Sequence, residues 1–225
     1  MRPVILACLL LASARAAAAG EESAEPAFEV TLAPVFWLPR FSGAVVATGD
    51  RERVRGEFGA AVLARVEAFR SSFGGRYEQG WLLLGTDDSD GRTRMNYTRL
   101  AGAARLDLGG GTRLLPSAGF RYLAAWNEIE SGGADSRRRW LEPWAGVAAE
   151  IPLVGGLSLR LEAAASGFGL GSRLCTELEA ALSLRIAEGW TLDAGFRRIT
   201  CDVPRGRFAL DARAAGPFAG LTLRF

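Results

Sequence analysis

The stretch GPFAGLTLRF, residues 216–225, decides the expected fold because its side chains alternate in character. One side of a strand would carry Pro217, Ala219, Leu221, Leu223 and Phe225, and the other would carry Phe218, Gly220, Thr222 and Arg224. Successive side chains of a β-strand point to opposite faces, so the first set forms one wholly apolar face. The stretch therefore predicts a strand that lies between an apolar and a more polar environment.

A strand with one apolar face and an aromatic residue at its end is typical of the closing strand of a bacterial outer-membrane β-barrel. In such barrels the apolar face meets lipid and the other face lines the lumen. We expect outer-membrane lipids to contact this apolar face. We also expect Leu221, Leu223 and Phe225 to form the signal by which the barrel-assembly machinery engages the last strand.

The N-terminal segment predicts export through the periplasm. Met1 and Arg2 precede an apolar run (residues 4–12) and a small-residue tract (residues 16–19), which is the pattern of a secretory signal peptide. The apolar run is too short to span a bilayer as a helix. We assign residues 1–19 to a signal peptide, 20–27 to a tether and 28–225 to a single outer-membrane barrel of a Gram-negative bacterium.

Charge and composition exclude several functions. The chain has 27 basic residues, all arginine, and 25 acidic ones, so removal of Arg2 and Arg15 leaves a balance of 25 − 25 = 0. Without a basic excess, nucleic acid is not an expected partner. Outer-membrane barrel enzymes such as lipid A acyl-modifying enzymes, phospholipase and omptin proteases depend as families on a histidine. This chain has none, so we expect no enzyme, no catalytic residue and no cofactor.

A metal site is not expected either. Asp87, Asp88 and Asp90 lie close together in the sequence and supply oxygen atoms of the kind that Ca²⁺ prefers. The surrounding residues lack the remainder of a calcium-loop signature, and a solvated loop with its turn at Gly91 explains the run equally well.

Turn residues divide the mature chain into about ten segments, each close to the length that a tilted strand needs to cross a bilayer. An all-β, antiparallel, up-and-down transmembrane barrel is therefore expected, with eight strands as the alternative if segments around 60–86 merge. The long connection at 40–59 is expected to be an outer loop. The ten segments are 28–39, 60–70, 76–86, 94–108, 113–126, 140–152, 157–168, 175–186, 191–201 and 215–225.

Charged residues occupy one face of several segments, as Arg160 and Glu162 do opposite Leu159 and Leu161. A midplane arginine facing lipid costs about 2–4 kcal/mol, so these charges are expected to point into the lumen. Hairpin registers estimated from the turns predict four opposite-charge pairs, which are Arg121–Glu142, Glu150–Arg160, Glu179–Arg197 and Asp193–Arg224.

These pairs predict a lumen filled by an arginine–carboxylate network. Buried charges must be paired to be tolerated, and the interior of a small barrel is just wide enough for side chains. A structural plug is thus preferred over a path for substrate.

Cys175 and Cys201 are the two cysteines of the mature chain, and the same register places them directly opposite each other. The periplasm and cell surface are oxidising enough to keep a disulfide. We predict a Cys175–Cys201 disulfide, with two free cysteines acting as small apolar fillers as the alternative.

The chain resembles a family of uncharacterised proteobacterial outer-membrane barrel proteins. The matching pieces cover nearly the whole mature chain and are LAPVFWLPRFSG (32–43), GFRYL (119–123), WLEPWAG (140–146), SGFGLGS (166–172) and GPFAGLTLRF (216–225). Ala148 stands where family members often carry arginine, and residues 40–59 match poorly. The resemblance implies an outer-membrane barrel and by itself no particular activity.

Three functions agree with these observations. The first is a small barrel with a plugged lumen and a structural or envelope role. The second is a narrow channel for small solutes across the outer membrane, and the third is surface binding or adhesion through the outer loops. The first is preferred because the segments between strands are rich in Arg, Asp, Glu and Gly, as plain solvated loops are.

Overall fold

The structure, a computed structural model, describes residues 28–47, 50–85, 91–129, 136–203 and 208–225. The signal peptide and tether predicted for residues 1–27 lie outside the described residues, as do Asp87, Asp88 and Asp90. Within the described part of the chain, no helix is long and apolar enough to cross a membrane.

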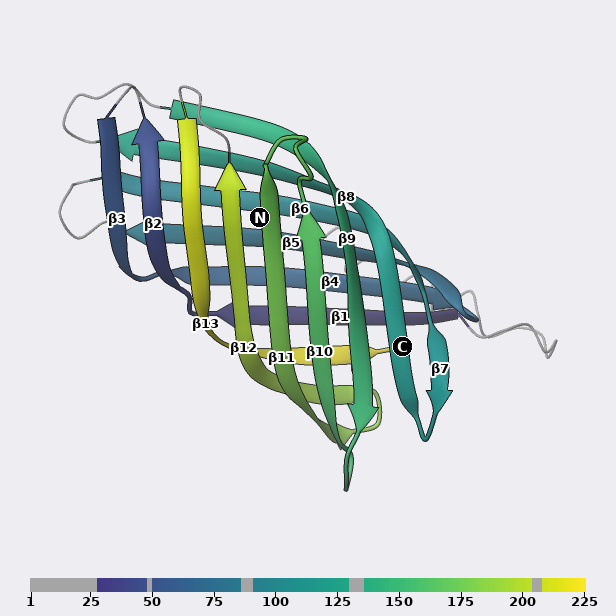
Figure 1. Cartoon of the computed structure of the whole chain (residues 1–225). Coiled ribbons are helices and arrows are strands. Elements are labelled where there is room, and N and C mark those ends of the chain that lie inside the picture. Colours follow the sequence, from purple (N-terminus) through teal and green to yellow (C-terminus); the bar gives the residue numbers. More distant parts are fainter. Residues whose placement is uncertain (1–27, 48–49, 86–90, 130–135, 204–207) are drawn as a thin grey trace.

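Thirteen antiparallel strands form one sheet (Figure 1). Their bounds are β1 (Phe28–Trp37), β2 (Arg40–Ala47), β3 (Asp50–Phe58), β4 (Ala60–Arg70), β5 (Phe73–Gly85), β6 (Gly91–Ala104), β7 (Leu106–Gly109), β8 (Thr112–Ile129), β9 (Ser136–Pro152), β10 (Leu157–Ser166), β11 (Leu174–Ala187), β12 (Trp190–Val203) and β13 (Phe208–Arg224). Strand β13 also pairs with β1, which closes a ring of ten strands. The other three strands lie outside this ring: β2 and β3 extend the sheet beside β13, and the short β7 pairs only with β8. The predicted ten-stranded antiparallel barrel is confirmed.

The prediction of an outer loop at residues 40–59 is wrong. Strand β2 continues β1 along β13, since Trp37 pairs with Phe218 and Arg40 pairs with Ala215 in one unbroken register. Strand β3 pairs with β2 and leads into β4. The high charge of this segment suggested a solvated loop, but β13 reaches up to Phe208 and offers its backbone groups to β2. The first hairpin therefore continues the sheet alongside β13, and β3 comes close to β5.

The register fixes the width of the barrel. A path of paired residues that begins at Val30 and crosses every strand of the ring returns at Ser42, which is 12 residues (42 − 30) further along the chain. This stagger sets the tilt of the strands, and ten strands leave an interior only slightly wider than one that side chains fill. Side chains of opposite walls can therefore meet across the lumen.

The two faces of the wall differ sharply in chemistry. Large apolar side chains are exposed on the outward face of nearly every strand, among them Phe36, Val62, Leu100, Phe120, Leu141, Leu161, Leu178, Leu192 and Phe196. On the inward face, charged side chains are buried, among them Arg76, Glu78, Arg99, Glu162 and Arg197. The fold is thus apolar outside and charged inside, the reverse of a soluble globular domain.

Gly80 offers a test of how tightly the lumen is packed. A methyl group added at Gly80 would overlap the ring of Tyr97, whereas one added at the outward Gly102 of β6 would meet no atom within 4 Å. We expect Gly80→Val to lower the free energy of unfolding by about 1–3 kcal/mol, the usual cost of overpacking. Gly102→Ala should leave it within about 0.5 kcal/mol. Thermal unfolding of the refolded barrel in detergent, followed by circular dichroism, measures both.

Candidate functional site

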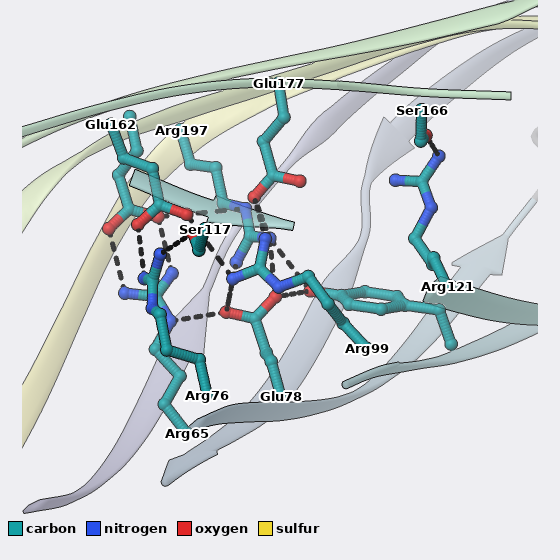
Figure 2. A network of polar contacts seen from close by, with 12 residues as sticks. Arg65, Arg76, Glu78, Arg99, Ser117, Arg121, Glu162, Ser166, Glu177 and Arg197 are labelled. Atoms are coloured by element: carbon teal, nitrogen blue, oxygen red, sulfur yellow. Dashed lines mark hydrogen bonds and ion pairs between the residues drawn. The ribbon is translucent and has the colours of Figure 1, made fainter. Parts of the chain in front are cut away.

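The carboxylate of Glu78 on β5 is the centre of the charged lumen (Figure 2). It accepts hydrogen bonds from Nε of Arg65 at 2.5 Å, Nη2 of Arg197 at 2.8 Å and Nη2 of Arg99 at 3.2 Å. The hydroxyl of Tyr97 donates to it at 2.6 Å. Arg65, Arg99 and Tyr97 come from the neighbouring strands β4 and β6, whereas Arg197 comes from β12, so one carboxylate joins its own wall to the opposite one.

A second centre lies beside it, around Arg76 on β5. Its Nη2 donates to Glu162 at 2.7 Å, its Nε to Glu67 at 3.1 Å and its Nη1 to Ser117 at 3.1 Å. Arg160 donates to the same Glu67 at 3.0 Å. Arg99, which lies 3.4 Å from Glu162, connects this group to Glu78.

The charges of this lumen network nearly balance. It combines the guanidinium groups of Arg65, Arg76, Arg99, Arg160 and Arg197 with the carboxylates of Glu67, Glu78, Glu150, Glu162, Glu177 and Glu179. The side chain of Arg197 is 0% exposed and that of Glu78 is 1% exposed. Charges so far from water are tolerated only when they are paired and hydrogen-bonded. The network therefore behaves as a fixed, packed element, and each of its five guanidinium groups is engaged by a carboxylate.

Three of the four pairs predicted from the sequence lie opposite each other in the register. Arg121 and Glu142 are 2.5 Å apart, and Arg160 and Glu150 are 2.8 Å apart. Glu179 faces Arg197 but lies 3.8 Å from its Nε, because Glu179 receives both Nη atoms of Arg65 from across the lumen.

The predicted Asp193–Arg224 pair is wrong. Asp193 faces Gly220 on β13 and accepts hydrogen bonds from Ser183 and Thr222, each at 2.5 Å. Arg224 instead lies 3.3 Å from Glu29 on β1. The prediction centred the last hairpin near residue 208, whereas β12 runs to Val203 and β13 begins at Phe208. This moves the register by four residues.

The part of the network that β4 and β5 supply was not predicted from the sequence. The pairs Arg65–Glu78 and Glu67–Arg76 face each other across the short turn at Ser71 and Ser72. The signal was present, because the hairpin arithmetic used for the later turns places both pairs in register. The contacts that cross the lumen, such as Arg65 to Glu179, had no signal in local sequence.

A smaller polar cluster lies around Glu142 on β9. Besides Arg121, its carboxylate accepts hydrogen bonds from Ser166 at 2.7 Å, Ser172 at 2.5 Å and Nε1 of Trp140 at 3.0 Å. All these partners are buried. Glu142 thereby holds the β10–β11 connection, which contains Ser172, against the inside of the wall.

The structure joins Cys175 and Cys201 by a disulfide, with their Cα atoms 4.1 Å apart. The two residues pair directly across β11 and β12, as the predicted register requires. The Sγ atom of Cys201 lies 3.9 Å from Nη2 of Arg121, so the disulfide adjoins the Glu142 cluster.

An apolar layer covers the network on the side of the β2–β3 hairpin. It consists of buried side chains from many strands, which are Val35, Trp37, Phe41, Leu63, Leu82, Leu123, Trp140, Val203 and Phe218 with several alanines. Trp37 is fully buried, and its ring lies 5.6 Å from the guanidinium of Arg197. The lumen thus holds both paired charges and this apolar layer.

A cavity of about 520 Å³ adjoins the network. Arg65, Glu67, Arg160 and Glu179 line it together with Val35 and Phe218 of the apolar layer, and it extends to the short turns at Gly156 and Gly189. Among the described side chains, no group of three or more Cys, Asp or Glu is placed to hold a metal ion.

Loss of Arg197 should destabilise the barrel strongly. We expect Arg197→Met to lower the free energy of unfolding by about 3–5 kcal/mol, because it removes a buried charge from Glu78 and leaves Glu177 with only Arg99 at 3.5 Å. As a control, Arg173→Met removes an exposed ion pair with Asp202 and should cost less than about 1 kcal/mol. Urea unfolding followed by tryptophan fluorescence measures both, and equal effects would contradict the structural role of the network.

The disulfide should stabilise the β11–β12 hairpin. Its cysteines are 26 residues apart. We expect Cys175→Ala with Cys201→Ala to lower the free energy of unfolding by roughly 2–4 kcal/mol, as removal of disulfides usually does. Mass analysis of unreduced, alkylated protein checks the bond itself. Two alkylated thiols in folded wild-type protein would contradict it.

Comparisons with known proteins give structural matches only, since no protein-family model and no curated protein matches the chain. The outer membrane protease OmpT from Escherichia coli is similar with a TM-score of 0.59 at 9% identity, over 91% of this chain and 99% of that one. An outer membrane channel from Pseudomonas putida F1 has a TM-score of 0.47 at 9% identity, over 92% and 100%. Ail of Yersinia pestis, an attachment invasion locus protein, has 0.44 at 11% identity, over 88% and 99%. At these identities the likeness concerns the fold, which is that of an outer-membrane β-barrel.

Proposed function

We propose that the chain is an outer-membrane barrel of a Gram-negative bacterium with a closed lumen and a structural or envelope role. The observation that carries this proposal is the shared Glu78 carboxylate, which Arg65 and Arg99 contact from the two neighbouring strands and Arg197 contacts from across the lumen. A channel needs a continuous water path, and here the charged network and the apolar layer both occupy the lumen.

The outward face supports the membrane placement. Exposed Phe, Leu and Val side chains surround the ring, and a soluble protein rarely exposes apolar surface of this extent. The short turns would face the periplasm and the β2–β3 hairpin would face outward, as in barrels with both ends of the chain on the periplasmic side. Export by residues 1–19 and assembly through Leu221, Leu223 and Phe225 belong to the same proposal.

We also propose that the chain is not an enzyme. OmpT is a protease by name, and its likeness to this chain concerns the fold alone. This chain has no histidine to act as a general base, and the buried carboxylates of the lumen are all engaged by guanidinium or hydroxyl donors. Membership of the proteobacterial barrel family that the sequence resembles fits this reading.

Two other functions each have one observation in their favour. The cavity of about 520 Å³ beside the network would be the periplasmic vestibule of a narrow channel, if the network could open. The β2–β3 hairpin, which extends the sheet beside β13, would be the contact surface of an adhesin or receptor. Neither observation supplies a through-path or a recognisable binding residue, so both rank below the closed barrel.

Conductance in a planar bilayer tests the closed lumen. We expect the refolded wild-type chain to give no discrete openings. Glu179→Ala with Arg197→Ala removes one pair from the network and should produce small openings or raise the leak, because water then enters the lumen. Arg139→Ala, on the outward face of β9, is the control and should stay silent. Discrete openings from wild type would refute the closed barrel and favour the narrow channel.

A further inference from the structure

Three arginines that the lumen network does not use gather on the outward face of β12, β13 and β2. Arg198 and Arg40 both pair with Ala215, one from each side, so they flank this small residue on neighbouring strands. Arg213 lies two residues from Ala215 along β13, on the same face, because side chains alternate along a strand. All three are exposed.

The spacing suits an anionic group. Neighbouring strands are about 4.8 Å apart, so the Cα atoms of Arg198 and Arg40 lie about 10 Å apart with only a methyl side chain between them. Among the described residues, Arg198 and Arg213 form no ion pair. Arg173 is also exposed, but it lies 3.7 Å from the carboxylate of Asp202, so we do not count it with these arginines.

The residues directly below the arginines are apolar. Phe196 pairs with Pro217, and the backbone N–H of Leu38 donates to the carbonyl of Pro217 at 3.0 Å. Phe196, Pro217 and Leu38 therefore form a row across the same three strands, parallel to the row of Arg198, Ala215 and Arg40 and two residues closer to the short turns. Phe196 and Leu38 are each 52% exposed. The outward wall thus changes from apolar to cationic within one step along the strands.

An apolar groove leads to this step. It has a volume of about 450 Å³, lies in the outward wall across β8 to β12, and ends at Phe196 and Arg198. Ala149, Ala163 and Ala180 line it and alternate with the larger Leu114, Leu161 and Leu178. Glu162 and Glu179 also border it, but their carboxylates are bonded inside the lumen. The surface that remains for a ligand is apolar up to Arg198.

We propose that this groove and the three arginines form a binding site for a phosphorylated lipid of the surrounding leaflet. An acyl chain lies in the groove over the alanines, and a phosphate of the headgroup lies over Ala215 between Arg198, Arg213 and Arg40. Guanidinium groups bind phosphate oxygens in a bidentate manner, and the bond is strengthened at the edge of a low-dielectric medium. The proposal rests on the proposed placement of the barrel in a membrane.

Lipid binding to the refolded whole chain in a neutral detergent tests the site. The probe is a diphosphorylated, multiply acylated glucosamine disaccharide, compared with its phosphate-free counterpart, and native mass spectrometry counts the bound copies. We expect at least one retained copy of the phosphorylated lipid. Arg198→Gln with Arg213→Gln should weaken binding about 100-fold, because each charge-assisted hydrogen bond to phosphate strengthens binding about tenfold. Arg139→Gln, an exposed arginine on the outward face of β9, is the control and should change binding less than about twofold.

A second variant separates the lipid from a free anion. Ala163→Phe fills the groove and leaves the arginines in place, so it should weaken binding of the acylated probe. The site would be overturned if the phosphate-free lipid bound as tightly as the phosphorylated one. It would also be overturned if Arg139→Gln weakened binding as much as Arg198→Gln with Arg213→Gln. Binding of inorganic phosphate that competes fully with the lipid and ignores Ala163→Phe would also overturn it, in favour of a soluble anion.

The fold of each variant is checked by its heat-dependent mobility in gel electrophoresis. A chain that folds as a heat-modifiable barrel but shows no preference for the phosphorylated lipid refutes the lipid site alone. A wild-type chain that enters neither detergent micelles nor bilayers as a folded barrel refutes the proposed membrane placement first.

Discussion

Glu78 is the residue on which the rest of the lumen depends. Its carboxylate is buried, so it is tolerated only because Arg65, Arg99, Arg197 and Tyr97 surround it. Each of these donors can reach it in one strand register only, since a slip by one residue would turn the side chain to the outward face. A single carboxylate thus fixes β4, β5, β6 and β12 relative to one another. The apolar layer and the cavity both adjoin the charged network that it centres.

Much of the fold could be predicted from alternation alone. The ten strands of the ring, the short turns and the opposite faces of β10 and β11 follow from period-two patterns that local sequence carries. The β2–β3 hairpin could not be predicted in this way. Strand β2 is held by β13, which lies more than 150 residues away in sequence, and a charged segment gives no sign of such a distant partner.

The charge pairs of the lumen also differ in how far they could be predicted from local sequence. Pairs within one hairpin, such as Arg121–Glu142 and Glu150–Arg160, could be predicted because a short turn fixes their register. The Asp193–Arg224 prediction was wrong because the connection between β12 and β13 is long and its centre was misplaced. Contacts across the lumen, such as Arg65–Glu179 and Arg76–Glu162, depend on the 12-residue stagger of the whole ring. The stagger is a property of ten registers together, so no single hairpin reveals it.

The closing pair of the ring has a consequence for how the barrel forms. β1 and β13 stand at opposite ends of the described chain, so the ring cannot shut until the last strand is in place. Arg197 and Glu78, which are 119 residues apart, lie on separate parts of an open sheet until then. In the open sheet their charges remain hydrated, and ring closure is the event that removes the water. Assembly is therefore a slow, long-range step in which joining the edges and drying the interior coincide.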